Sequence, residues 1–128
     1  NEGIDVLFLQ PVDRNKVRPA LELCKKKHIP VFVIDSEVSD TEAVVSTIVS
    51  DNYDAGVQCA KDMMKKKTSA NIIIVNQKAL NSINERVKGF RDTIKGHPQY
   101  KIVEEKESAA EFEIAMKVME KIIYEKKN

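Results

Sequence analysis

Short apolar runs alternate along the chain with segments whose apolar residues are spaced three and four apart. The runs indicate strands that are covered on both faces of a parallel sheet, because they are nearly continuous and rich in β-branched side chains. A more polar run near the carboxyl end predicts one further strand. The five expected strands are residues 4–9 (IDVLFL), 31–34 (VFVI), 44–49 (VVSTIV), 71–75 (NIIIV) and 101–106 (KIVEEK).

Helical spacing fills the intervals between these runs. Asp13 is placed to cap a helix that runs to about Lys27, and Pro19 is close enough to its start to be tolerated. Further helices are expected at about 53–66, 81–95 and 110–125. The alternation predicts an α/β fold, with a parallel sheet and flanking helices.

Composition narrows the class of protein. The chain has 128 residues, with 42% hydrophobic and 32% charged residues, as in ordinary soluble globular proteins. Lys and Arg number 21 against 20 Asp and Glu, so the basic excess typical of nucleic-acid binding is absent. The lysine runs at 25–27 and 65–67 close expected helices, where cations complement the helix dipole.

The motifs of common enzymes are missing. The glycine pattern contains neither G-x-G-x-x-G nor a Walker A loop, and no G-x-S-x-G elbow occurs. His28 and His97 lie beside prolines at expected helix ends, which favours capping. Cys24 and Cys59 lie on apolar helical faces and are expected to be buried thiols, although their redox state stays open. We therefore expect no catalysis, cofactor or metal.

Polar residues follow the expected strands, at the edge where parallel sheets bind ligands. Aspartate and asparagine side chains at this edge suit a neutral ligand with many hydroxyl groups. Taken singly, Asp13, Asp51 and Asn81 are better explained as helix caps or turn residues than as ligand contacts. The strand-end residues are Asp13, Asp35, Ser36, Asp51, Asn52, Asn76 and Gln77.

Five motifs in a fixed order carry a resemblance over almost the whole chain. The chain resembles type I periplasmic sugar-binding proteins, above all the ribose-binding branch, whose fold LacI-type regulators share. The resemblance implies two Rossmann-like α/β lobes that close on a ligand by a hinge. The motifs are Gly3-Ile4-Asp5 followed by Pro11-Val12-Asp13; Ile29-Pro30-Val31 through Ile34-Asp35; Ser50-Asp51-Asn52 with Gly56; Arg86-Val87-Lys88-Gly89-Phe90; and Ala110-Glu111-Phe112.

The resemblance also implies an internal fragment of a longer protein. Residues 1–50 correspond to the later part of the first lobe, 51–54 to a hinge crossing, and 55–128 to the first part of the second lobe. Ser50, Asp51 and Asn52 are the implied hinge residues. Because both lobes are then incomplete, the chain alone is expected to bind sugar weakly or not at all. Its open sheet edges favour dimerisation or strand exchange.

Site residues are carried over position by position. In the family, the residue that corresponds to Asp35 accepts hydrogen bonds from sugar hydroxyls. The arginine that corresponds to Arg86 reaches the sugar from the second lobe, and the aromatic residue that corresponds to Phe112 packs on the sugar ring. Asp13 and Ser36 are further ligand-contact candidates. The alternatives are a turn aspartate, a surface or ion-paired arginine, and a core phenylalanine at helical spacing. Ribose binders usually have arginine at position 36, so Ser36 leaves the identity of the sugar open.

The implied function is that of the solute-binding component of an ABC-type sugar importer. Its partners would be a small sugar or polyol and a membrane permease. The protein would be located in the periplasm or outside the cell, with or without a lipid anchor. Two alternatives share the fold: the effector domain of a LacI-type regulator and the sugar-sensing domain of a membrane receptor kinase. Regulators commonly have Gly-His before the strand at 71, where this chain has Thr68-Ser69-Ala70.

Overall fold

The computed structural model describes residues 3–109 and 111–125 of the chain. It divides into two compact units, one of Asn1–Asp51 with Ala79–Ser82 and one of Asn52–Lys78 with Ile83–Asn128. Each unit contains its own parallel sheet and at least one helix packed against it. The predicted α/β class with parallel strands is thereby confirmed.

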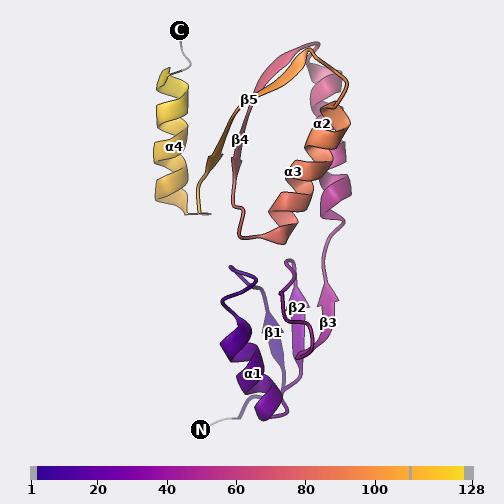
Figure 1. Ribbon diagram of the computed structural model, residues 1–128, viewed down its shortest axis with the longest axis vertical. Helices are drawn as coiled ribbons and strands as arrows, with labels where there is room; N and C mark the ends of the chain where they lie inside the picture. Colours follow the sequence, from indigo (N-terminus) through magenta and orange to yellow (C-terminus); the bar gives the residue numbers. More distant parts are fainter. Residues whose placement is uncertain (1–2, 110, 126–128) are drawn as a thin grey trace. The chain divides into compact units, whose positions relative to one another are not determined.

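The first unit holds three strands in the order β1-β2-β3, all parallel. They are β1 (Leu7–Leu9), β2 (Val31–Ile34) and β3 (Val44–Ile48), and α1 (Arg18–Lys26) lies along one face of the sheet (Figure 1). Leu21 of α1 is fully buried against Val31 and Val33 of β2 and against Val38. This small apolar cluster is the core that fixes the strand ends.

Two boundaries in this unit differ from the sequence prediction by three residues or more. The first strand begins at Leu7 instead of residue 4, where the Leu7 N–H donates to the carbonyl of Pro30 at 2.9 Å. Pro30 has no N–H with which to extend the ladder upstream. The first helix begins at Arg18 instead of just after Asp13, because Pro19 cannot bond to residue 15 and its ring would crowd that carbonyl.

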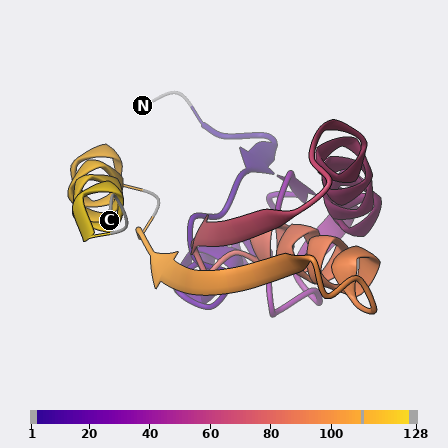
Figure 2. The same cartoon turned by 90° about the horizontal axis from the view of Figure 1, so that it is seen from above.

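The second unit has a two-stranded parallel sheet and three helices. The strands are β4 (Ala70–Asn76) and β5 (Tyr100–Glu107), and the helices are α2 (Asn52–Lys66), α3 (Asn81–Ile94) and α4 (Phe112–Glu125). α2 and α3 lie together on one side of the sheet, while α4 stands apart from them (Figures 1 and 2). Ala60, Ile94 and Tyr100 are buried where α2 and α3 meet the strands.

α2 and α3 cross with their backbones in direct contact. A Cβ atom on Gly56 would lie 1.9 Å from the carbonyl oxygen of Arg86, and one on Gly89 would lie 2.1 Å from that of Tyr53. Only glycine fits at both positions, because any Cβ would overlap with backbone that cannot turn away. The two glycines therefore set how closely the helices approach.

A cluster of polar side chains lies at the surface beside the same crossing of α2 and α3. The Asp92 carboxylate accepts hydrogen bonds from the Tyr53 hydroxyl and the Lys88 ammonium, both at 3.1 Å. The ammonium also lies 4.6 Å from the centre of the Tyr53 ring. The hydrogen bonds from Lys88 and Tyr53 lower the pKa of Asp92, and the same contacts with Asp92 raise the pKa of Lys88 and of Tyr53.

The two cysteines are free thiols in different surroundings. Cys24 is partly buried and packs on the core of the first unit, in line with the prediction. The prediction of a buried Cys59 is wrong, because its neighbour Ala60 takes the buried position on α2. Cys59 instead lines an apolar cavity of about 350 Å³ along β4 that also contacts Gly56 and Arg86.

Replacing Gly56 with alanine is expected to destabilise the protein by about 3 kcal/mol, the upper end of the range for overpacked sites. The new methyl group would push α2 away from the backbone of Arg86. Chemical denaturation measures the loss, and Gly3→Ala is the matched control because nothing lies within 4 Å of its Cβ position. Equal stability of the two variants would contradict the close crossing.

Asp92 should make stability depend on acid pH. Its pKa is lower in the folded protein than in the unfolded chain, so its contribution is present above the unfolded pKa and is lost as pH falls through the folded pKa. The melting temperature of Asp92→Asn should lie below that of the wild type at neutral pH and approach it in acid. Tyr53→Phe, which removes one of the two donors, should give a smaller difference. A gap between wild type and Asp92→Asn that stays constant with pH would refute this role.

Candidate functional site

Asp35 stands at the carboxyl end of β2 in an unusual backbone conformation. Its φ angle is 69°, and the N–H of Ser36 donates across it to the carbonyl of Ile34 at 2.8 Å. This is a three-residue turn with positive φ, which is rare and strained. The N–H of Asp35 itself donates to the carbonyl of Ile48 at 2.9 Å, which ties the turn to β3.

The strain at Asp35 is evidence for a functional position. A left-handed conformation in a residue other than glycine costs on the order of 1–3 kcal/mol and persists where the surroundings enforce it. Here the turn leaves the Asp35 side chain exposed at the edge of the sheet, while Val38 further along the same loop is buried in the core. A strained backbone thus presents an exposed carboxylate at the edge where α/β sheets bind ligands.

Gln10 is the partner of this carboxylate. It is the first residue after β1, and its side-chain amide donates to Oδ2 of Asp35 at 3.0 Å. The carboxylate keeps its other oxygen for further donors, and the Gln10 amide has a carbonyl that accepts. Sequence reasoning missed Gln10, although the strand-end rule that selected Asp35 applies to it equally.

Asp13 lies in the loop between β1 and α1 and is engaged with its own backbone. Its Oδ1 accepts from the N–H of Asn15 at 2.9 Å and of Lys16 at 3.3 Å. The hydrogen bond from Asn15 is the main reason that the pKa of Asp13 is lowered. This geometry matches the alternative of a turn residue, and Asp13 stabilises the loop rather than the helix end that was predicted.

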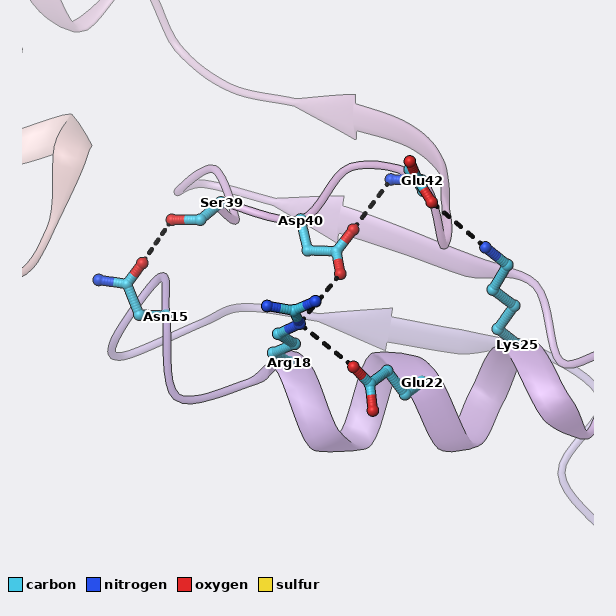
Figure 3. A network of polar contacts seen from close by, with 7 residues as sticks. All are labelled: Asn15, Arg18, Glu22, Lys25, Ser39, Asp40 and Glu42. Carbon is cyan, nitrogen blue, oxygen red and sulfur yellow. Dashed lines mark hydrogen bonds and ion pairs between the residues drawn. The ribbon is translucent and has the colours of Figure 1, made fainter.

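The loops after β1 and β2 are joined by a network of polar side chains (Figure 3). The Ser39 hydroxyl donates to Asn15 Oδ1 at 2.6 Å and accepts from Arg14 Nε at 2.9 Å. Its backbone N–H donates to the carbonyl of Arg14 at 3.1 Å. Asp40 pairs with Arg18 at 3.6 Å, which connects the second loop to α1. These contacts hold together the two loops that carry Gln10 and Asp35.

Ser36 is buried, with 2% of its surface exposed, and its hydroxyl lies 2.7 Å from that of Ser82 within the first unit. The next residue, Glu37, accepts a hydrogen bond from the amide of Asn81 at 2.9 Å. Ser36 therefore contacts the segment Ala79–Ser82, and its role as a ligand contact stays a prediction.

In the second unit, Arg86 lies on α3 and Asn52 opens α2. The Nε–H of Arg86 donates to Oδ1 of Asn52 at 2.8 Å, and Asn52 is only 7% exposed. The helix crossing at Gly56 brings the two residues together, because it presses α2 against the backbone of Arg86. Arg86 Nε thus bonds to a neutral amide while the residue itself is exposed, and the alternative of a surface or ion-paired arginine stays open.

Phe112 begins α4 with 81% of its surface exposed, so the alternative of a core phenylalanine is wrong. The loop before it contains Ala109 with a φ of 53°, a second strained residue that follows a strand end. The motif residue Ala110 lies outside the described residues. Phe112 is thus available for contact with a ligand or with another part of the protein.

The implied hinge residues Ser50, Asp51 and Asn52 lie where β3 is followed by α2. One boundary between the compact units falls between Asp51 and Asn52, and their hinge role stays a prediction. Over residues 3–109 and 111–125, no group of three or more His, Cys, Asp or Glu side chains is arranged to hold a metal ion. No helix in that part of the chain is both long and apolar enough to cross a bilayer.

Comparison of the sequence and the structure with known proteins identifies the family of this chain. The chain is 29% identical over 107 residues to the galactofuranose-binding protein of Escherichia coli K12, covering 80% of this chain and 34% of that protein. It is 31% identical over 98 residues to the ribose import binding protein of Haemophilus influenzae, covering 74% and 33%. The chain thus spans about a third of the length of these curated relatives.

A solved structure of a galactofuranose-binding protein superposes with a TM-score of 0.82 at 26% identity, covering 98% of this chain and 44% of that one. The family model described as "Periplasmic binding protein domain" matches residues 1–128. The predicted resemblance is confirmed, and the chain belongs to the periplasmic binding protein domain family.

Proposed function

We propose that these residues form part of a sugar-binding site in a two-lobed solute-binding protein. The full-length protein would capture a small sugar or related polyol outside the cytoplasmic membrane and deliver it to the permease of an ABC-type importer, without converting it chemically. The similarity to a galactofuranose-binding protein and to a ribose import binding protein supports this class of ligand.

The observation that carries the proposal is the exposed Asp35 carboxylate in its strained turn. Charged acceptors form strong hydrogen bonds with hydroxyl groups, and a rigid acceptor binds without losing much entropy. Gln10 holds one carboxylate oxygen at 3.0 Å and offers its own carbonyl beside it. Gln10 and Asp35 together thereby present several fixed acceptors, which suits a polyol because its neighbouring hydroxyl groups each donate a hydrogen bond.

The second unit supplies the complementary groups in this proposal. Arg86 donates its Nε–H to Asn52, and its two terminal nitrogens carry the four N–H groups that would donate to sugar oxygens. Phe112 offers an exposed ring on which the C–H face of a sugar can pack. Asp13 and Ser36 would be further ligand contacts, and in the structure Asp13 also stabilises its own turn while the Ser36 hydroxyl lies against that of Ser82.

The division into lobes is part of the same proposal. Residues 1–50 would belong to the first lobe and 55–128 to the second, with a hinge crossing at 51–54. Because the chain spans about a third of its relatives, other segments would complete the site. Dimerisation or strand exchange of the isolated chain stays a prediction.

A thermal-shift screen of the full-length protein tests the ligand class. A sugar that binds the folded state raises the melting temperature by mass action. We expect a shift with at least one of a panel of D-ribose, L-arabinose, D-galactose and myo-inositol. A panel without effect, together with a shift caused by an amino acid or a nucleoside, would overturn the proposed function.

Asp35→Asn in the full-length protein should lower the affinity for the sugar that gives the largest shift by about 10- to 100-fold, since it removes charge-assisted hydrogen bonds. Asparagine also tolerates positive φ, so the turn should persist. Calorimetry measures both affinities. Glu42→Gln is the matched control, because Glu42 lies on the same loop and forms an exposed ion pair with Lys25. Equal affinity of Asp35→Asn and Glu42→Gln would remove Asp35 from the site.

A further inference from the structure

Asn52 occupies a position that its sequence context explains only in part. It is the first residue of α2 and the first residue of the second unit, where a short polar side chain commonly begins a helix. A helix start is normally exposed, yet Asn52 is only 7% exposed. Its Oδ1 atom is directed to Arg86, 34 residues further along the chain, at 2.8 Å.

We propose that Asn52 is a positioning residue for the Arg86 guanidinium, an inference that rests on the proposed role of Arg86 in sugar binding. The contact is made by Nε, the nitrogen at the base of the planar fork. Fixing Nε sets the plane of the guanidinium and leaves both terminal nitrogens unengaged by this bond. Asn52 therefore orients the donors without competing for them.

The scaffold around this contact is rigid. Gly56 lies one helical turn after Asn52, and its Cα is pressed against the backbone carbonyl of Arg86 itself. Gly89, three residues after Arg86, is pressed in the same way against the carbonyl of Tyr53, the neighbour of Asn52. Two reciprocal backbone contacts thus flank the hydrogen bond and hold donor and acceptor at a fixed separation.

A long arginine side chain loses much rotational freedom when it binds a ligand. An arginine already held at Nε has lost part of that freedom before the sugar arrives, which favours binding. A neutral acceptor is suited to this task, because a carboxylate at the same place would attract the whole cation and compete with the sugar oxygens. The amide of Asn52 orients Arg86 and leaves its charge available.

The test measures sugar affinity in the full-length protein by calorimetry, with whichever of D-ribose, L-arabinose, D-galactose and myo-inositol gives the largest thermal shift. Asn52→Ser keeps a residue that begins helices well, but its hydroxyl ends short of Arg86. We expect it to lower affinity by about 3- to 10-fold. Asn52→Asp keeps an acceptor at the same distance but adds a charge that competes with the sugar, so its affinity should lie between those of Asn52→Ser and the wild type. Asn84→Ala is the control, because the Asn84 amide donates to the carbonyl of Lys78.

A double-mutant cycle separates positioning from general destabilisation. Arg86→Lys keeps the charge but has no Nε, so Asn52→Ser should cause no further loss of affinity in that background. Losses that add in the double variant, or an Asn52→Ser affinity equal to that of Asn84→Ala, would overturn the inference while leaving Arg86 in the site. If Arg86→Lys and Arg86→Ala both leave affinity unchanged, the proposed role of Arg86 fails instead.

Discussion

Parallel strand pairing is the constraint on which the rest of this structure depends. It directs the carboxyl ends of neighbouring strands to the same edge of a sheet, so residues distant in sequence become neighbours. In the first unit, Leu9 pairs with Val33, and Gln10 and Asp35 follow directly beyond that register. In the second, Asn76 pairs with Glu107, just before the strained Ala109. The candidate ligand groups arise at these edges because the pairing gathers them there.

The two units hold their functional side chains by different physical means. In the first unit, hydrogen bonds between loops hold these side chains, and Ser39 joins the loop of Asn15 to the loop of Asp35. In the second, backbone contact between helices brings Arg86 to Asn52, and the polar contacts around Asp92 lie at the margin of that crossing. The candidate residues of the first unit therefore depend on polar geometry, and those of the second unit depend on steric fit.

Much of the fold could be read from the sequence, and the exceptions have identifiable causes. β2 was predicted at its observed bounds because Pro30 and Asp35 flank a short apolar run on both sides. α1 starts later than predicted because the effect of Pro19 on residue 15 outweighs the capping potential of Asp13. The buried side of α2 includes Ala60 and leaves Cys59 out, a difference of one position that helical spacing alone does not resolve.

The candidate site was predictable in its residue types and less so in its contacts. Asp35 and Arg86 came from motifs, whereas Gln10 was overlooked and the partners of both residues were unknown. No local pattern encodes the positive φ of Asp35, since glycine is the usual signal for that conformation. The hydrogen bond from Arg86 to Asn52 spans 34 positions and requires the helix crossing to be known first.

The left-handed turn at Asp35 also limits how this position can evolve. Its φ of 69° favours glycine, asparagine or aspartate, whereas β-branched residues there would strain the backbone severely. Glycine keeps the turn and loses the side chain, and asparagine keeps the turn and loses the charge. Aspartate alone meets the conformational and the chemical requirement together. Under the proposed sugar-binding role, drift toward a new ligand would therefore occur less at position 35 than at neighbours such as Gln10, whose φ angle is not positive.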